Sequence, residues 1–275
     1  MKSLAILDID DTLFDWLSMW TTSFIGFRSA LASACEQQLI EIDLRLRRAH
    51  KSVGTSEYPF KGMELNDLFP EIEVSKLSEI SDQLQAARAD GHKLYGGVSD
   101  SLLELRSTGF RIALHTDAPP LLAGYRVKKL GIAKFADGLY STRSRVAKSL
   151  NEVPRGCECP HIVVQAKKPD PTALNQILTD FEVEAPDAVY VGDSLMRDVA
   201  MASDCNVVSV HASYGDNRDT QGYELLRAVS HWTDEDIEFE RRLKDRGTVL
   251  PSAVVTSPGE IAKAVFHAKA GKSFT

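Results

Sequence analysis

The feature that most constrains this chain is a short apolar run followed at once by clustered acids. Residues 4–7, Leu-Ala-Ile-Leu, are followed by three carboxylates and a hydroxyl within five positions: Asp8, Asp10, Asp11 and Thr12. The apolar run predicts a short buried strand. Clustered acids repel one another unless a cation or a proton relieves them, so they cost stability and indicate a functional site. The simpler alternative is a turn in which Asp10 or Asp11 caps a following helix.

Composition limits the classes of protein that remain. A chain of 275 residues with 43% hydrophobic residues can form one large core, or a core and a smaller domain. A net charge of −7 argues against a nucleic-acid partner, which would need a basic face. No stretch approaches the roughly eighteen apolar residues of a membrane span, and the first residues lack the apolar length of a signal peptide. These features are normal for a soluble cytoplasmic protein, and they predict no nucleic-acid or membrane partner.

The cysteines indicate the same compartment. The chain has four of them, Cys35, Cys157, Cys159 and Cys205. The stretch 157–161, Cys-Glu-Cys-Pro-His, resembles half of a metal site, but no second half with matching spacing exists. We therefore expect free thiols in a reducing environment.

Residues 14–92 have a helical pattern. Their apolar periodicity predicts helices at 16–36, 39–50 and 74–89. Between the second and the third helix runs a loop bounded by Gly and Pro, residues 54–62, which carries Tyr58, Phe60 and Lys61. No strand is expected in this region.

After Gly97 helices and strands alternate, which is typical of a parallel sheet with crossover helices. The expected strands are 111–115, 135–140, 161–165, 188–193 and 206–211. The expected helices are 99–107, 121–130, 172–181, 194–203, 234–246 and 258–269. The predicted fold class is therefore α/β, a doubly wound parallel sheet with a smaller all-α unit. The segments 141–160 and 212–247 have no clear role.

Four of the predicted strand ends carry chemical groups, and ligands of open parallel sheets bind at the carboxyl ends of strands. These groups are Asp8 with Asp10, Thr116, Lys168, and Asp193 with Asp198. Each has a simpler explanation by itself, as a helix cap, a surface lysine or a turn residue. Together the carboxylates offer the oxygen ligands that Mg²⁺ prefers, while a lysine and a hydroxyl can hold phosphate oxygens. The set predicts magnesium-dependent phosphoryl transfer.

The order of these groups resembles the haloacid dehalogenase (HAD) superfamily. The matching motifs are Asp8-Ile9-Asp10-Asp11-Thr12, Thr116 at a strand end, Lys168-Pro169, and Gly192-Asp193-Ser194 followed by Asp198. The resemblance covers residues 1–13 and about 95–211. It implies a Rossmannoid catalytic core made of residues 1–13 and 93–275, with residues 14–92 inserted as a helical cap.

The resemblance also implies roles for individual residues. Asp8 would attack phosphorus and form an aspartyl-phosphate, and Asp10 would act as general acid and then general base. Thr116 and Lys168 would bind the phosphate, with Lys167 as the rival for the lysine role. The carboxylates expected at the Mg²⁺ ion are those of Asp8, Asp10, Asp193 and Asp198, the last as a ligand or as a support for the lysine.

Several functions share these motifs. A phosphomutase would pass the phosphoryl group to a sugar hydroxyl instead of water. A phosphorylatable receiver domain has an acid pair and a later lysine, but it is much shorter and lacks a large insertion. A non-catalytic regulatory protein on this fold usually loses a motif acid, and this chain keeps them all. The favoured function is a phosphatase, monomeric or homodimeric, that acts on a small phosphorylated metabolite.

The helical insertion is expected to decide the substrate. A phosphate-handling core recognises little beyond the phosphoryl group, so discrimination among leaving groups must come from an element placed over it. An insertion joined by two linkers can open to admit a small substrate and close to exclude water. The expected contacts to the leaving group are Tyr58, Phe60 and Lys61.

Overall fold

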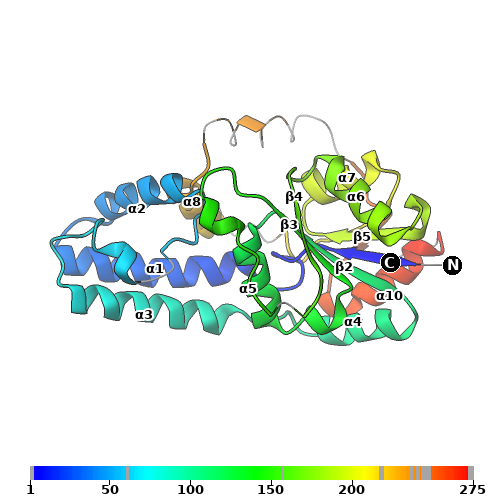
Figure 1. Cartoon of the computed structure of the whole chain (residues 1–275), viewed down its shortest axis with the longest axis horizontal. Coiled ribbons are helices and arrows are strands. Elements are labelled where there is room, and N and C mark those ends of the chain that lie inside the picture. Colours follow the sequence, from blue (N-terminus) through cyan, green and yellow to red (C-terminus); the bar gives the residue numbers. More distant parts are fainter. Residues whose placement is uncertain are drawn as a thin grey trace.

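The computed structural model describes residues 3–59, 62–156, 158–216, 220–233, 235, 238–239, 242 and 249–271. These residues form two parts, a parallel sheet with helices on both faces and a bundle of long helices beside it (Figure 1). Both termini lie at the end of the molecule that holds the sheet. Among the described residues, no helix has the length and apolarity that a membrane span requires.

The described residues contain a seven-stranded sheet of order β4-β3-β2-β1-β5-β6-β7. Every pair of neighbouring strands in it is parallel. The strands are β1 (Leu4–Leu7), β2 (Arg111–Thr116), β3 (Gly138–Thr142), β4 (His161–Val164), β5 (Ala188–Gly192), β6 (Val208–Ala212) and β7 (Ala253–Val255). The chain winds outward from β1 through β2 to β4, then returns to the other side of β1 with β5. The crevice between β1 and β5 is therefore the switch point where doubly wound folds bind ligands.

The central strand β1 is buried on both faces, which explains its unbroken apolar sequence. Ala5 and Leu7 belong to one core cluster and Leu4 and Ile6 to the other, as the alternation of side chains along a strand requires. The first cluster is completed by helices α4 (Val98–Ser107), α5 (Pro120–Leu130) and α10 (Ile261–Lys269). The second is completed by α6 (Pro171–Phe181) and α7 (Ala200–Asp204). This architecture confirms the predicted α/β class.

Most expected elements are present, with shifted ends. The strand expected at 135–140 begins only at Gly138, because Ala133–Phe135 forms a 3-10 turn (η2). The helix expected at 194–203 begins with a π-helical turn, η5 (Leu195–Val199). The helix expected at 234–246 lies mostly outside the described residues. The remaining short turns are η1 (Gly62–Leu65), η3 (Lys148–Asn151), η4 (Ala185–Asp187) and η6 (Pro258–Glu260).

The bundle has its own hydrophobic core. Its helices are α1 (Trp16–Cys35), α2 (Leu39–Val53), α3 (Val74–Gly91) and α8 (Thr220–Val229). Helix α1 is capped by Asp15, whose carboxylate accepts a hydrogen bond from Ser18 N at 2.9 Å. Helix α2 ends at Gly54, where φ is 76° and a residue without Cβ is favoured. The core is built around Trp20, Phe24 and Leu46, all fully buried.

Helix α8 joins this bundle although it lies far from the other three helices in sequence. Its residues Leu226 and Val229 are buried in the same cluster as Trp20. His50 Nδ1 lies 2.6 Å from Val229 O, and a Cβ on Gly222 would come within 2.7 Å of Thr21 Oγ1. The segment 212–247, which had no clear role in the sequence, thus contributes a packed helix to the insertion.

The bundle core predicts that two leucines of α2 contribute differently to the free energy of unfolding. Leu46 is fully buried and Leu44 is 48% exposed. Replacing Leu46 by Ala leaves a cavity and should lower the free energy of unfolding by about 2–5 kcal/mol. Leu44→Ala, the same substitution on the same helix, should change it by less than about 0.5 kcal/mol. Urea unfolding followed by circular dichroism measures both, and equal losses would contradict this account of the bundle.

Candidate active site

A cavity of about 200 Å³ opens at the carboxyl ends of β1 and β5. Its floor carries the charged groups of the sequence motifs, and its walls come from the bundle. The charged groups include Asp8, Asp10, Lys168, Asp193 and Asp198. The tertiary structure therefore brings the first, third and fourth motifs together at the place where the sheet topology predicts a ligand.

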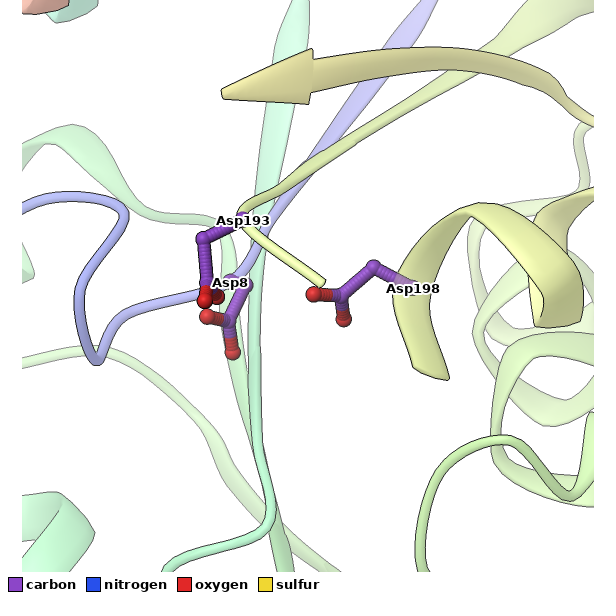
Figure 2. Close-up of side chains that lie close together, drawn as sticks. All are labelled: Asp8, Asp193 and Asp198. Atoms are coloured by element: carbon purple, nitrogen blue, oxygen red, sulfur yellow. The ribbon is translucent and has the colours of Figure 1, made fainter. Parts of the chain in front are cut away.

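Three carboxylates form the centre of this floor. Asp8 follows β1, Asp193 follows β5, and Asp198 lies on the π-helical turn η5. Each offers one oxygen, and these oxygens all lie within 4.8 Å of one another. Figure 2 shows Asp8 and Asp193 next to each other and Asp198 pointing toward them. A set of carboxylate oxygens at this spacing fits a hard divalent cation such as Mg²⁺.

The π-helical turn gives Asp198 its position. Ser194 N donates a hydrogen bond of 3.0 Å to Asp198 Oδ2, so the carboxylate folds back over the start of its own turn. It lies against Gly192, where a Cβ would come within 2.3 Å of Asp198 Cγ. The glycine of the fourth motif is therefore required by close packing, and π-helical turns often occur at functional sites.

Lys168 compensates the charge of this group. Its ammonium forms ion pairs with Asp8 and, at 2.8 Å, with Asp198 Oδ1. Its backbone N–H donates to Asp117 Oδ1 at 3.0 Å, which fixes the loop after β4. Burial by itself lowers the pKa of Lys168, but Asp198 and Asp8 raise this pKa well above its ordinary value. Lys167 is exposed, so of the two candidate lysines only Lys168 lies in the site.

The second aspartate of the first motif has different partners. Asp10 Oδ2 accepts hydrogen bonds from Thr116 Oγ1 at 3.2 Å and from Arg126 at 2.9 Å. Asp10 lies outside the group formed by Asp8, Asp193 and Asp198, although it was expected among the metal ligands. Burial raises the pKa of Asp10, and the guanidinium of Arg126 opposes this shift. The two aspartates therefore have separate environments, as different chemical roles would require.

Arg126 is a site residue that the sequence reasoning missed. Its side chain is 3% exposed and forms ion pairs with Asp10 and with Glu57, a residue of the loop after α2. Trp16 Nε1 also donates to Glu57, at 3.4 Å. A signal was present in the sequence, because Arg126 lies on the buried face of α5, next to Val127 and four residues after Leu122. A charge on such a face needs a buried partner.

Burial raises the pKa values of several carboxylates in this site. Burial raises the pKa of Asp8 to about 8, an effect that Lys168 opposes and Asp198 reinforces. Burial, reinforced by Asp198, raises the pKa of Asp193 well above its ordinary value. Burial also raises the pKa of Asp11 to about 7, although its Oδ1 accepts a hydrogen bond from Leu17 N. A bound cation would lower these pKa values again, because it stabilises the ionised form of a carboxylate.

Of the three expected leaving-group contacts, the structure describes only Tyr58, which lies away from the cavity. The Tyr58 hydroxyl donates to Glu64 O at 2.8 Å, and Tyr58 does not line the cavity. Phe60 and Lys61 lie outside the described residues. The aromatic residues that do line the cavity are Trp16, Tyr223 and Trp232. The last two follow β6 in a segment whose sequence has no recognisable motif, so only the folded chain reveals them.

The sheet topology and the acid cluster define a Rossmannoid fold with a site suited to phosphoryl transfer. A family model described as haloacid dehalogenase-like hydrolase matches residues 2–206. The chain therefore belongs to the haloacid dehalogenase-like hydrolases. This confirms the resemblance drawn from the motifs.

Individual curated relatives match only part of this chain. A phosphoglycolate phosphatase of Vibrio cholerae serotype O1 is 31% identical over 170 residues, which are 61% of this chain and 61% of the relative. A second, from Vibrio parahaemolyticus serotype O3:K6, is 29% identical over 51% of this chain and 58% of the relative. The chain thus spans about three fifths of the length of these curated relatives.

The similarity to solved structures supports the fold and says nothing about the function. A 2-haloacid dehalogenase of Pseudomonas syringae pv. Tomato DC3000 aligns with a TM-score of 0.56 and 17% identity, over 97% of this chain and 99% of the other. A haloacid dehalogenase-like family hydrolase of Xanthomonas campestris aligns with a TM-score of 0.55 and 16% identity, over 98% and 96%. Both alignments extend over the sheet and the bundle.

The space around Gly192 and Gly26 predicts that replacement by alanine changes the free energy of unfolding in opposite directions at the two positions. Gly192→Ala forces a methyl group against Asp198 and should lower the free energy of unfolding by about 1–3 kcal/mol. Gly26→Ala, in the middle of α1, meets nothing within 4 Å and should raise it by about 0.5–1 kcal/mol. Urea unfolding measures both values. A Gly192→Ala protein as stable as the wild type would show that Asp198 can move away without cost.

Proposed function

We propose that the protein is a magnesium-dependent phosphatase that hydrolyses a small phosphate monoester through an aspartyl-phosphate. The observation that carries this proposal is the meeting of Asp8, Asp193 and Asp198 with Lys168 on one cavity floor. Family membership and relatives named as phosphoglycolate phosphatases support it. Because those relatives match only in part, 2-phosphoglycolate is a first substrate to test and not an assignment.

Asp8 is proposed as the nucleophile. Lys168 holds its Oδ1, and the Thr12 hydroxyl donates to its Oδ2 at 3.1 Å, so the carboxylate is oriented before a substrate arrives. One carboxylate oxygen attacks phosphorus, the bond to the leaving oxygen breaks, and an aspartyl-phosphate forms. Lys168 offsets the repulsion between the carboxylate and the phosphate.

Asp10 is proposed as the general acid and base. In protonated form it gives a proton to the leaving oxygen, and in ionised form it takes a proton from the water that attacks the aspartyl-phosphate. Burial raises the pKa of Asp10, which favours the protonated form that the first step needs. Thr116 and Arg126 hold the side chain through hydrogen bonds to Oδ2.

Mg²⁺ is the proposed cofactor, with Asp8, Asp193 and Asp198 as the residues that would hold it. When bound, it would neutralise negative charge on the phosphate oxygens. In this proposal residues 1–13 and 93–275 form the catalytic core and residues 14–92 the cap, with α8 of the core segment packed into the cap. The substrate is a small phosphorylated metabolite enclosed between them.

The first functional prediction concerns the metal. Phosphate release from phenyl phosphate should require Mg²⁺ and should fall by at least about 100-fold in Asp8→Asn and Asp193→Asn. Mg²⁺ should also raise the melting temperature of the wild type and not that of Asp193→Asn. Asp100→Asn, on the exposed start of α4, is the matched control and should behave as the wild type. Full turnover in the presence of a chelator would refute the proposal.

The second functional prediction separates Asp8 from Asp10. Asp10→Asn should still accept phosphate from a substrate with a good leaving group, such as 4-nitrophenyl phosphate, but should hydrolyse the intermediate slowly. Mass spectrometry of the quenched protein should therefore find a phosphoryl group on Asp8. A phosphoryl group on residue 10 of the wild type would reverse the two roles. Transfer of this group to an added sugar phosphate faster than to water would indicate a phosphomutase.

A further inference from the structure

The chain passes from the sheet to the bundle at a third place, after β6. Tyr214 donates to Thr12 O at 2.7 Å, and a Cβ on Gly215 would come within 2.0 Å of Asp11 O. The segment therefore runs directly against the loop that carries the first motif. It then forms α8, which packs in the core of the bundle.

The residues that follow α8 are also fixed to the bundle. Ser56 Oγ lies 3.0 Å from His231 Nδ1, and His231 N donates back to Ser56 Oγ at 3.3 Å. Trp232 packs at the edge of the bundle core and forms an edge-to-face pair with Tyr223, with ring centroids 6.1 Å apart. These two rings are thus held in place before any ligand binds.

This segment supplies part of the cavity wall. Tyr223, Leu226 and Trp232 line the same cavity as the catalytic carboxylates, and Trp16 of α1 adds a third ring. Tyr223 and Trp232 are half-buried, and both line the cavity. Apolar and aromatic walls with few polar groups are typical of small-molecule sites.

The charges on the cavity surface restrict the leaving group further. The described cations that line it are Lys168 and Arg197. Lys168 is paired with Asp8 and Asp198, and Arg197 lies 3.6 Å from Asp117 Oδ2. Within the described lining, each cation thus already faces a carboxylate. A leaving group with a carboxylate of its own would meet a surface in which acids outnumber bases.

We propose that Tyr223 and Trp232 form the leaving-group subsite and that it accepts an uncharged leaving group with a flat ring face. Aromatic rings and sugar rings both present such a face, and either can stack on an aromatic side chain. This inference rests on the proposed phosphatase function and names its substrate class. It places specificity on a segment outside the inserted residues 14–92.

The test compares kcat/KM for four substrates in wild type, Trp232→Ala and Tyr223→Ala. Phenyl phosphate carries an aromatic ring, glucose 1-phosphate a sugar ring, and 2-phosphoglycolate a free carboxylate. Acetyl phosphate, an acyl phosphate, carries neither a ring nor a free carboxylate while it is bound. Each alanine variant should lower kcat/KM about 10-fold for the ring substrates and less than about 2-fold for acetyl phosphate. Trp232→Phe, which keeps a flat face, should restore most of the loss. Tyr125→Ala, an aromatic residue outside the cavity, should leave all four values unchanged.

Each outcome has a defined meaning. A loss for phenyl phosphate alone would identify an aromatic leaving group, and a loss for glucose 1-phosphate alone a sugar. Equal losses on every substrate, acetyl phosphate included, would show that Trp232 and Tyr223 only maintain the fold, and this would overturn the inference. A wild-type preference for 2-phosphoglycolate that the variants do not alter would also overturn it, while leaving the phosphatase function intact.

A binding measurement separates the inference from the proposed function. In Asp8→Asn with Mg²⁺, calorimetry should find phenyl phosphate bound about 10-fold more tightly than methyl phosphate, and adding Trp232→Ala should remove the difference. If the wild type hydrolyses none of the esters but this preference holds, the phosphatase function fails and the ring subsite stands. If no preference exists, the subsite fails whatever the activity.

Discussion

The ion pairs of Lys168 with Asp8 and Asp198 are the interaction on which the rest of the site depends. Three carboxylates gather within 4.8 Å of one another at the end of the central strands, and burial makes each charge costly. One buried ammonium relieves part of this cost and aligns Asp8 at the same time. The remaining negative charge would favour a divalent cation and would repel an anionic substrate in its absence. The same three carboxylates thus lower the stability of the fold and provide the proposed binding site for a cation.

A second buried cation connects this site to the bundle. Arg126 lies in the sheet part of the molecule. Its two partners are Asp10, two residues after Asp8, and Glu57, in the loop between α2 and α3. The position of the bundle is thereby coupled to the orientation of Asp10. Removing either carboxylate would leave a buried guanidinium half-compensated, which is more costly than losing a surface pair.

Helix α8 adds a third connection to a bundle that the sequence predicts to be a cap on two linkers. It ties the bundle to β6 through a third stretch of chain, and Val229 O is 2.6 Å from His50 Nδ1 in the last turn of α2. Opening of the bundle over the site would have to carry this helix along or break its packing. The same segment brings Trp232 to the cavity, so one stretch of chain both packs in the bundle and supplies part of the cavity wall.

Local patterns were enough to predict the class of fold, the order of the motifs, and the carboxylates and lysine of the site, because apolar strands and the acids that follow them can be read from neighbouring residues. Asp8 and Lys168 could be predicted in this way, since strand ends of a parallel sheet converge. Tertiary structure alone decided that Asp10 pairs with Arg126, that Tyr58 lies away from the cavity and that Trp232 lines it. Those contacts join segments far apart in the chain, and the distances between such segments are set by packing, which no local pattern encodes.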